Sequence, residues 1–376
     1  MNKGLKLKYI ILFSGYNQRA VIAFLRTLTQ NHVDNYIIFA ASEKDSILKT
    51  EYRSRVFVIR KNKVLDYNEI ESYIHDAKLK LGFEKFLIPP TTEALNRFLI
   101  EYEEKFNLTG YISSLVSKRL YELVSDKLKF SELCFEQNIL IPERIQFPQV
   151  FREEFVAKPL TYYDKEGRVF SPILIETKND FRIFDKNYPK ESFYYQRYIH
   201  GRSIYLLYYF PLNSNNLKIL KFSQENFMQQ PYGKSILVAK PSDYHLKHIS
   251  DQFERLFQHV GYTGFVMVEL RVDGDKPYMI EANPRFWGPS QLFVDAGCNF
   301  FEVYLNDYKF INKKIDTNNI NMDVKYFWHS GTVTKESVNN CFFNDYKQEY
   351  LEEFCELVQW DIYKRKDTNQ LFLEYE

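Results

Sequence analysis

A short stretch between residues 265 and 285 limits what this chain can fold into more than any other part of it. Residues 265–272 place apolar side chains at every second position, which is the period of a β-strand with one buried face. Gly274, Asp275 and Lys276 follow as a three-residue turn, and residues 278–285 return as a second strand. We therefore expect an antiparallel hairpin. Its buried face would carry Val266, Val268, Leu270 and Val272, and its other face Met267, Glu269 and Arg271.

The register of this hairpin brings two acidic side chains together. Glu269 lies opposite Glu281, because both are six residues from Asp275. Like charges that face each other destabilise a strand pair, unless a divalent cation with oxygen ligands lies between them. Asn283 and Arg285 follow at a spacing of two and share the face of Glu281. Two acids, an amide and a guanidinium suit a metal-bound polyphosphate; the alternative is a pair of solvated glutamates on an exposed sheet face.

The size and charge of the chain exclude several kinds of partner. A chain of 376 residues is expected to form two or three domains. Its net charge of +1 argues against a broad surface for nucleic acid or for an anionic membrane. No apolar run approaches the length of a membrane span. We therefore expect neither nucleic acid nor a membrane among its partners.

The cysteines indicate a reducing environment. They are widely spaced, contain no Cys-x-x-Cys pair and have no histidine cluster nearby, so they fit neither a disulfide framework nor a zinc site. A reduced, cytoplasmic setting suits them best. The four residues are Cys134, Cys298, Cys341 and Cys355.

The first hundred residues alternate between strand and helix patterns. Such alternation predicts a parallel sheet with both faces covered. Residues 89–93 follow the fourth strand and are well placed to touch a ligand at its carboxyl end. No Gly-x-Gly-x-x-Gly motif follows the first strand, which disfavours a dinucleotide site. The predicted strands are 9–13, 36–40, 55–59 and 85–89, and the predicted helices are 18–28 and 67–81.

The pattern changes after a helical stretch at residues 117–137. Short strands and loops follow, then a helix over 243–260 and the hairpin described above. The chain beyond residue 309 has no clear chemical signature. The predicted strands in this part are 155–159, 173–175, 193–197, 204–210 and 218–222.

The order of four short motifs resembles the ATP-grasp superfamily, most closely the branch of biotin carboxylase and the large subunit of carbamoyl-phosphate synthetase. The likeness spans roughly residues 117–300 and takes in four pieces, of which the last is the most specific. They are Ser125-Asp126-Lys127 with a helix that ends at residues 138–142, the Phe-Val-Ala-Lys-Pro strand at 155–159, the hinge-like residues 195–201, and Glu269 with residues 281–288.

The resemblance implies a fold of mixed α/β and α+β class. An N-terminal Rossmann-like domain, the pre-ATP-grasp domain, would cover residues 1–112. A two-lobed ATP-grasp domain would cover residues 113–309. Residues 310–376 would be a C-terminal extension of unknown role.

The resemblance also implies roles for individual residues and the cofactors ATP and Mg²⁺, with Mn²⁺ as the alternative metal. Phosphoryl transfer depends on positioned cations more than on covalent catalysis, and the roles that follow provide such cations. Lys127 and Lys158 would contact the α- and β-phosphates. Gln196, Arg197 and Ile199 would frame the adenine. Glu269, Glu281 and Asn283 would coordinate the metal that bridges the β- and γ-phosphates, so that Glu269 also belongs to the nucleotide site. Arg285 would steady the transferred phosphoryl group.

One segment departs from the superfamily pattern. Relatives commonly carry a glycine- and serine-rich loop over the triphosphate, whereas residues 160–172 contain only Gly167. Few backbone amides there can adopt the positive φ angles of a tight phosphate cradle. Lys165 and Arg168 are the available sources of charge instead. Whether the loop closes over the triphosphate is left open.

The most favoured function is an ATP-dependent carboxylate–amine ligase that forms a C–N bond through an acyl phosphate and releases ADP and phosphate. Its partners would be a small carboxylate and a small amine, with a thiol as the alternative acceptor; the oligomeric state stays open, with a homodimer as one option. Bicarbonate is less favoured as the acid, because no biotin-attachment Met-Lys-Met motif is present. The alternative from another class is a nucleotide-binding sensor or scaffold that keeps the fold without turnover.

Overall fold

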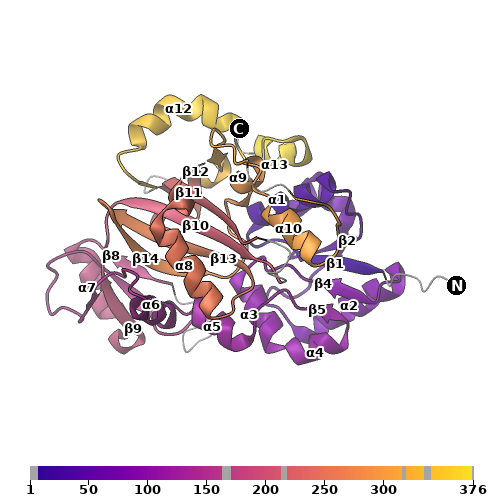
Figure 1. Cartoon of the computed structure of the whole chain (residues 1–376), viewed down its shortest axis with the longest axis horizontal. Helices are drawn as coiled ribbons and strands as arrows, with labels where there is room; N and C mark the ends of the chain where they lie inside the picture. The colour runs from indigo at the N-terminus through magenta and orange to yellow at the C-terminus, as the bar shows by residue number, and fades with distance from the viewer. Residues whose placement is uncertain (1–6, 163–170, 213–217, 316–318, 334–339, 375–376) are drawn as a thin grey trace.

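The computed structural model describes residues 7–162, 171–212, 218–315, 319–333 and 340–374 (Figure 1). Three β-sheets and the helices packed on them form this part of the chain. The mixed α/β and α+β class predicted from the sequence is confirmed.

The N-terminal part is a five-stranded parallel sheet with the order β3-β2-β1-β4-β5. Successive residues of β1 and β2 point into two different hydrophobic cores, because helices cover both faces of the sheet. Helix α1 packs on one face, and α2, α3 and α4 pack on the other. The strands are β1 (Lys8–Phe13), β2 (Tyr36–Ala40), β3 (Val56–Ile59), β4 (Lys85–Leu87) and β5 (Tyr111–Ile112). The helices are α1 (Gln18–Gln30), α2 (Tyr67–Leu81), α3 (Glu93–Glu101) and α4 (Glu103–Leu108).

The largest sheet is antiparallel and has seven strands. Its order is β14-β13-β10-β11-β12-β15, with β16 paired to β11. Helix α8 packs on one face, where it buries the predicted apolar side of the hairpin. Helices α9 and α10 pack on the other face and join this sheet to α1 in one shared core. The elements are β10 (Arg202–Phe210), β11 (Leu220–Gln229), β12 (Ile236–Pro241), β13 (Gly264–Asp273), β14 (Lys276–Asn283), α8 (His248–His259), α9 (Ser290–Asp295) and α10 (Phe300–Asp307).

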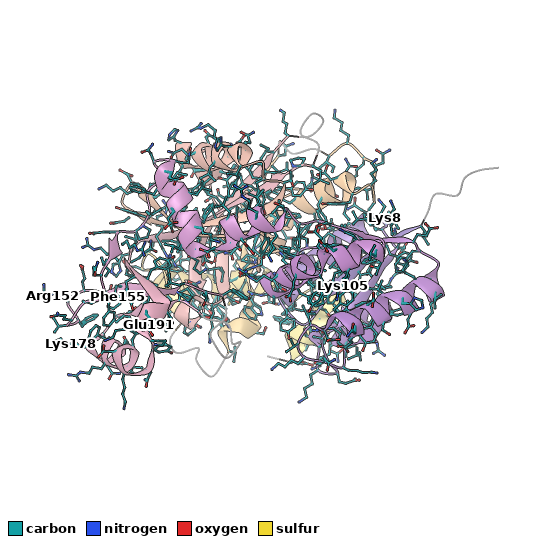
Figure 2. All side chains as sticks on the ribbon, turned by 90° about the horizontal axis from the view of Figure 1, so that it is seen from below. Lys8, Lys105, Arg152, Phe155, Lys178 and Glu191 are labelled. Carbon is teal, nitrogen blue, oxygen red and sulfur yellow. The ribbon has the colours of Figure 1, made fainter. Side chains whose placement is uncertain are left out.

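A small four-stranded antiparallel sheet with the order β6-β9-β7-β8 forms a separate lobe. Figure 2 shows Phe155 and Glu191 of this lobe at one end of the molecule and Lys8 and Lys105 of the N-terminal part at the other. Helix α7 covers one face of the sheet with an aromatic core. The elements are β6 (Arg144–Ile145), β7 (Phe155–Pro159), β8 (Ile173–Ile175), α7 (Lys178–Asn187) and β9 (Phe193–Arg197).

The helical stretch predicted at residues 117–137 is two helices rather than one. It breaks at Asp126, whose side chain accepts hydrogen bonds from the backbone amides of Leu128 and Lys129 at 3.0 and 2.9 Å. This N-cap satisfies amides that the start of a helix leaves free. Lys127 is therefore the first residue of the second helix. The two helices are α5 (Lys118–Ser125) and α6 (Lys127–Glu136).

The C-terminal residues extend the large sheet and then return to the N-terminal part. Strands β15 (Tyr326–Phe327) and β16 (Cys341–Phe342) pair with β12 and β11, and α12 (Lys347–Gln359) packs beside them. Helix α13 (Asn369–Leu373) joins the core of α1. The short helix α11 (His329–Thr332) follows β15.

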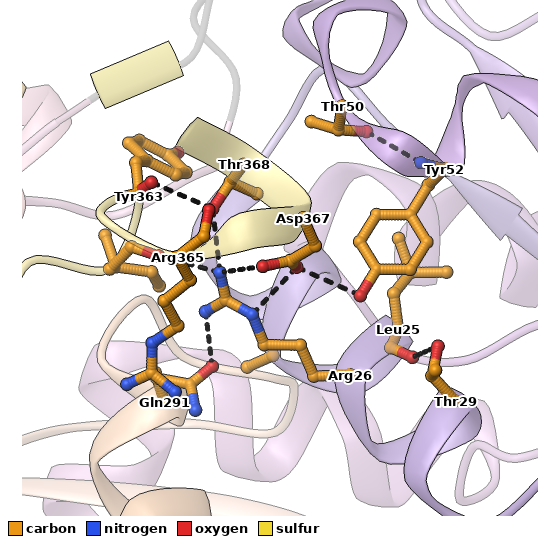
Figure 3. Close-up of polar contacts among 12 residues, drawn as sticks. Leu25, Arg26, Thr29, Thr50, Tyr52, Gln291, Tyr363, Arg365, Asp367 and Thr368 are labelled. Atoms are coloured by element: carbon orange, nitrogen blue, oxygen red, sulfur yellow. Dashed lines mark hydrogen bonds and ion pairs between the residues drawn. The ribbon is translucent and has the colours of Figure 1, made fainter. Parts of the chain in front are cut away.

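A buried polar network fastens this C-terminal segment to α1 (Figure 3). Arg26 of α1 forms an ion pair with Asp367 at 2.9 Å and donates hydrogen bonds to the carbonyl of Ile362 and to Thr368. Its Nη1 donates to Gln291 Oε1 at 2.8 Å, so α9 belongs to the same network. The extension is therefore tied to two other parts of the fold. Among the helices of the described residues, none combines the length and the apolar character that crossing a bilayer requires.

Candidate functional site

The hairpin of β13 and β14 pairs Glu269 with Glu281, as the sequence predicts. The turn is shorter than expected, because Lys276 pairs with Asp273 and leaves only two residues between the strands. A β-bulge keeps Glu269 opposite Glu281 despite the shorter turn. The register shifts between Glu269 and Leu270, and Ile280 is the extra residue on β14. Glu269 and Asn283 are buried, and the Glu281 side chain is 23% exposed.

Two lysines from different elements converge on β14. Lys127, at the start of α6, donates a hydrogen bond from Nζ to Glu281 Oε2 and forms an ion pair with it. Lys158, from β7 of the small lobe, donates from Nζ to the carbonyl of Ile280 at 2.8 Å. The bulge leaves Ile280 outside the ladder, so its carbonyl is available to the lysine. Lys127, Lys158, Glu269 and Glu281 thus form one group of charges, called the charge cluster below.

The charge cluster shifts the pKa values of its members. Burial alone would raise the pKa of Glu281, but Lys127 outweighs it and lowers the pKa to about 2. Burial opposes the charge of Lys127, yet Glu281 raises the pKa of that lysine. Burial raises the pKa of Glu269; Arg271 opposes this change and Glu281 adds to it. Burial, followed by repulsion from Lys127, lowers the pKa of Lys158 to about 8.

Asn283 and Arg285 continue the cluster along the chain. Asn283 donates from Nδ2 to Glu281 Oε1 at 2.8 Å and accepts at Oδ1 from Arg285 Nη2 at 3.1 Å. The other amine of the guanidinium, Nη1, donates to the carbonyl of Phe286 at 3.0 Å. Arg285 is thereby fixed beside the two acids.

The donor set of the cluster suits a magnesium ion held together with phosphate. In the described residues no group of three or more His, Cys, Asp or Glu side chains could hold a metal ion. Glu269, Glu281 and the amide oxygen of Asn283 offer two carboxylates and one further hard oxygen. Magnesium is commonly held by one or two carboxylates and completes its octahedron with substrate phosphates and water. The three residues therefore fit such an ion.

A large cavity opens beside the charge cluster. Its volume is about 980 Å³, and Glu269, Glu281, Asn283 and Arg285 line one end of it. The loops that follow β1, β3 and β4, at the carboxyl ends of the parallel strands, line another part of it, together with α3, Tyr205 of β10 and residues 233–236. In open α/β sheets this edge is where ligands bind. The lining includes residues 91–93, which the sequence singled out, together with Tyr16, Asn17, Arg19 and Arg60.

Hydrogen bonds hold the N-terminal loops against the segment that carries Arg285. The backbone amide of Phe286 donates to the carbonyl of Pro90 at 2.8 Å. Asn17, which adopts a left-handed conformation at φ 50°, donates from Nδ2 to the carbonyls of Thr91 and Phe286. The N-terminal loops of the cavity are therefore joined to the segment that carries Arg285.

The three residues predicted to frame adenine lie farther from the charge cluster. Gln196 is buried on the same face of β9 as Tyr194, and its Nε2 donates to the carbonyl of Pro142 at 3.2 Å. Arg197 lies on the opposite face, where its exposed guanidinium forms ion pairs with Glu143 and Glu153. Ile199 follows β9 and is half-buried. The structure therefore brings together Lys127, Lys158, Glu269, Glu281, Asn283 and Arg285, but not the side chains of Arg197 and Ile199.

Two neighbours of the cluster were not assigned from the sequence. Arg271, which the sequence places on the same face as Glu269, forms an ion pair with it at 3.2 Å. The ring of Phe343, from the C-terminal extension, lies 4.4 Å from the Arg271 guanidinium. The face shared by Arg271 and Glu269 was a usable signal, whereas nothing in the pattern of residues 310–376 pointed to Phe343.

The glycine-poor segment at residues 160–172 is only partly described. Gly167, Lys165 and Arg168 lie outside the described residues, so the prediction about this loop stays a prediction.

No protein-family model matches the sequence, and no curated protein matches it. Solved structures do match. N5-carboxyaminoimidazole synthetase from Staphylococcus aureus, solved with ADP, aligns over 94% of this chain and 98% of its own, with a TM-score of 0.60 and 16% identity. The biotin carboxylase domain of 2-oxoglutarate carboxylase from Hydrogenobacter thermophilus, solved as a dimer with MgADP, ADP and bicarbonate, aligns over 84% of this chain and 73% of its own, with a TM-score of 0.60 and 14% identity.

A third match is the L-amino acid ligase from Bacillus licheniformis. It aligns over 83% of this chain and 78% of its own, with a TM-score of 0.54 and 12% identity. At such identities the likeness establishes the fold alone. That fold is the ATP-grasp fold, as the order of motifs in the sequence predicts.

Proposed function

We propose that this protein is an ATP-dependent ligase that joins a small carboxylate to a small amine through an acyl phosphate. The observation that carries the proposal is the charge cluster, in which Glu269 and Glu281 face each other with two lysines beside them, and both acids line a cavity of about 980 Å³. The matched structures support it, since two of them were solved with ADP and one with MgADP.

In this proposal each residue of the cluster has a separate task. Lys158 and Lys127 donate hydrogen bonds to phosphate oxygens, and Lys127 leaves Glu281 to do so. Glu269, Glu281 and Asn283 hold the magnesium ion, with manganese as the alternative. When bound, the ion neutralises charge that develops on the β- and γ-phosphates. Arg285 donates to the transferred phosphoryl group, because Asn283 and the Phe286 carbonyl fix its guanidinium next to the acids.

The reaction would proceed in two displacements. A substrate carboxylate oxygen attacks the γ-phosphorus, the bond to the bridging oxygen breaks, and ADP leaves. The amine then attacks the acyl carbon, the bond to phosphate breaks, and the amine loses a proton as the amide forms. The protein orients the reactants and stabilises charge, so no protein nucleophile is required.

The lining of the cavity supports a separate place for each substrate in this proposal. The nucleotide would lie between the small lobe and β14, where Lys158 bridges the two. The acid and the amine would enter from the side of the N-terminal loops, which line part of the cavity. In this proposal residues 1–112 are the pre-ATP-grasp domain, residues 113–309 the ATP-grasp domain and residues 310–376 the extension.

The decisive experiment measures ADP release from Mg-ATP with pooled carboxylic acids and amines, for the wild type and for Glu281→Gln. We expect release that requires both pools and falls by about 100-fold or more in the variant, because one metal ligand loses its charge. Exposed Glu132 of α6 supplies the matched control, Glu132→Gln, which should leave the rate unchanged.

Calorimetric titration with Mg-ATP separates the enzyme from the sensor. Turnover that is lost in Glu281→Gln while nucleotide still binds supports the ligase. If no pool gives ADP release while Mg-ATP binds tightly to the wild type, the ligase is contradicted and the sensor or scaffold is favoured.

A further inference from the structure

Arg60 is a buried cation with unpartnered guanidinium nitrogens in the described part of the chain. It follows β3, is only 4% exposed and lines the cavity. Neither Nε nor Nη1 of its guanidinium has a partner in the described residues. The ring of Tyr16 lies 6.0 Å away, which is at the outer limit of a cation–π contact. Asp66, the nearest acid in the sequence, accepts instead from the backbone amide of Glu69, and Glu69 accepts from the backbone amides of Lys61 and Asn62 and from the hydroxyl of Tyr73.

Three other arginines in or near this region have hydrogen-bond partners for their guanidinium groups. Arg19 donates to Ser235, Tyr326 and the carbonyl of Ile236. Arg26 makes five hydrogen bonds, two of them to Asp367. Arg97 forms an ion pair with Glu93 at 2.8 Å. Arg60 therefore differs from the arginines that serve the fold.

A buried charge without a counter-charge is unfavourable, so the fold alone gives no reason for Arg60. A ligand anion would supply what is missing. The planar guanidinium donates two parallel hydrogen bonds to a carboxylate or a phosphate, which is the geometry that arginine recognises best.

A second unpartnered donor lies in the same cavity. The hydroxyl of Thr91 is buried, with the residue 1% exposed, and it has no hydrogen-bond partner in the described residues. It precedes the nine-residue helix α3, whose N-terminus carries a partial positive charge. Both features favour an anionic or strongly polar ligand.

Arg60 is remote from the reacting end of the cavity. The Phe286–Pro90 hydrogen bond places Arg285 next to the loop after β4, whereas Arg60 follows β3. Strands β2 and β1 lie between β3 and β4. Three strand spacings of roughly 4.8 Å separate the two loops by about 14 Å at the backbone. A group held by Arg60 is thus a different group from the one that reacts beside Arg285.

We propose that Arg60 binds a second, non-reacting anionic group of the acid or amine substrate, either a carboxylate or a phosphate. The substrate class is therefore an elongated molecule with an anionic end inside the N-terminal domain and a reacting carboxylate or amine at the charge cluster. That this substrate reacts at the charge cluster rests on the proposed ligase function. Anion binding by Arg60 can be tested without turnover.

The test compares melting temperatures of the full chain, loaded with Mg-ADP so that the nucleotide site is filled. The probes are glutarate and glycerol 3-phosphate, with uncharged glutaramide and glycerol as their controls. We expect one of the two anions to raise Tm by about 2 °C at millimolar concentration in the wild type. Neither should do so in Arg60→Gln, and the uncharged controls should have no effect. A response to glutarate identifies a carboxylate, and a response to glycerol 3-phosphate identifies a phosphate.

The melting temperatures of the ligand-free proteins provide a second readout. A structural role of Arg60 and a role in anion binding predict changes of Tm in opposite directions when Arg60 is replaced. Arg60→Gln removes an uncompensated buried charge, so its Tm should equal or exceed that of the wild type. Arg26→Gln, which breaks a saturated network, should lower Tm, and exposed Arg53→Gln should leave it unchanged.

The proposal is overturned if no anion raises Tm in the wild type, if the rise is the same in Arg60→Gln, or if Arg60→Gln melts as early as Arg26→Gln. Once the substrates are known, Arg60→Gln should raise KM for one of them about 10- to 100-fold with little change in kcat or in KM for ATP. Loss of anion binding in the variant without any ADP release from the wild type would support Arg60 and reject the ligase.

Discussion

Lys158 shows at the scale of one residue how burial lowers the pKa of a cation that is proposed to bind phosphate. Its ammonium lies between the small lobe and the bulge of β14, and its pKa falls from 10.5 to about 8. Only the protonated form attracts phosphate. Above pH 8 the free protein therefore holds this lysine increasingly as a neutral amine.

The resulting prediction concerns the pH dependence of nucleotide use. As pH rises through about 8, kcat/KM for ATP should fall by up to about tenfold per pH unit, because this ratio reports groups of the free enzyme. Lys158→Arg keeps its charge well above that pH and should flatten the falling limb. The measurement is kcat/KM for ATP against pH in both proteins. If the falling limb of kcat/KM has the same midpoint pH in the arginine variant, the titration of another group causes it.

The lowered pKa of Lys158 changes the free energy of unfolding in the opposite direction. Between about pH 8 and 10.5 the unfolded chain binds a proton at Lys158 that the folded chain does not. The free energy of unfolding contributed by this residue therefore rises with pH in that window. Nucleotide binding and ligand-free stability should respond to alkaline pH in opposite directions at this one site.

At the scale of elements, the hairpin shows why the key pairing could be predicted and why its details could not. The alternation of apolar residues fixed the faces of β13, and the count from Asp275 gave the pairing of Glu269 with Glu281. The turn was wrong by one residue, and the bulge at Ile280 compensated for it. Bulges have no reliable signal in a single sequence, although this one supplies the carbonyl that receives Lys158.

The C-terminal extension also acts through one of its strands. Strand β16 pairs with β11, and the next residue, Phe343, places its ring over Arg271, which holds Glu269. Phe343→Ala should loosen Arg271 and raise KM for Mg-ATP by about tenfold, within the range of a partly desolvated cation–π contact. Steady-state kinetics check this expectation.

Phe354→Ala is the matched control for that variant. Phe354 packs in the C-terminal core beside Phe327, and in the described residues the ring over the Arg271 guanidinium is that of Phe343. Both variants should lower Tm, because each deletes a packed ring. Equal KM values for the two would show that Phe343 contributes packing alone.

At the scale of the whole molecule, three parts of the chain meet around one cavity. The order of strands and helices predicted the parallel sheet, and the resemblance of the motifs implied the ATP-grasp fold. Residues 89–93 were singled out because they follow a strand of that sheet, and residues 91–93 do line the cavity. Arg60 was missed, because it is an ordinary charged residue after a strand until loops distant in sequence bury it. Contacts such as Phe286 with Pro90 depend on packing that no local pattern encodes.

The C-terminal network predicts how strongly the extension supports the rest of the molecule. Asp367→Asn leaves the Arg26 guanidinium buried without its counter-charge, so the free energy of unfolding should fall by about 3–5 kcal/mol. Replacing both residues, as Arg26→Met with Asp367→Leu, should recover part of that loss. Urea denaturation measures all three proteins.

The nearby pair of Lys49 with Glu374 offers a control, because both side chains are more than a third exposed. Glu374→Gln should change the free energy of unfolding by about 0.5 kcal/mol or less. A loss for Asp367→Asn as small as this would mean that the extension is only loosely attached.

The ion pair between Lys127 and Glu281 has a consequence for the order in which ligands arrive. Without nucleotide, the lysine already neutralises the acid that a metal would need, so free magnesium has to compete with a cation supplied by the protein itself. In the proposed function, the triphosphate would draw Lys127 toward its own oxygens and release the carboxylate at the moment when the metal enters with it. Occupancy of the metal site would then follow the concentration of ATP rather than that of free magnesium, and the two ligands would bind as one.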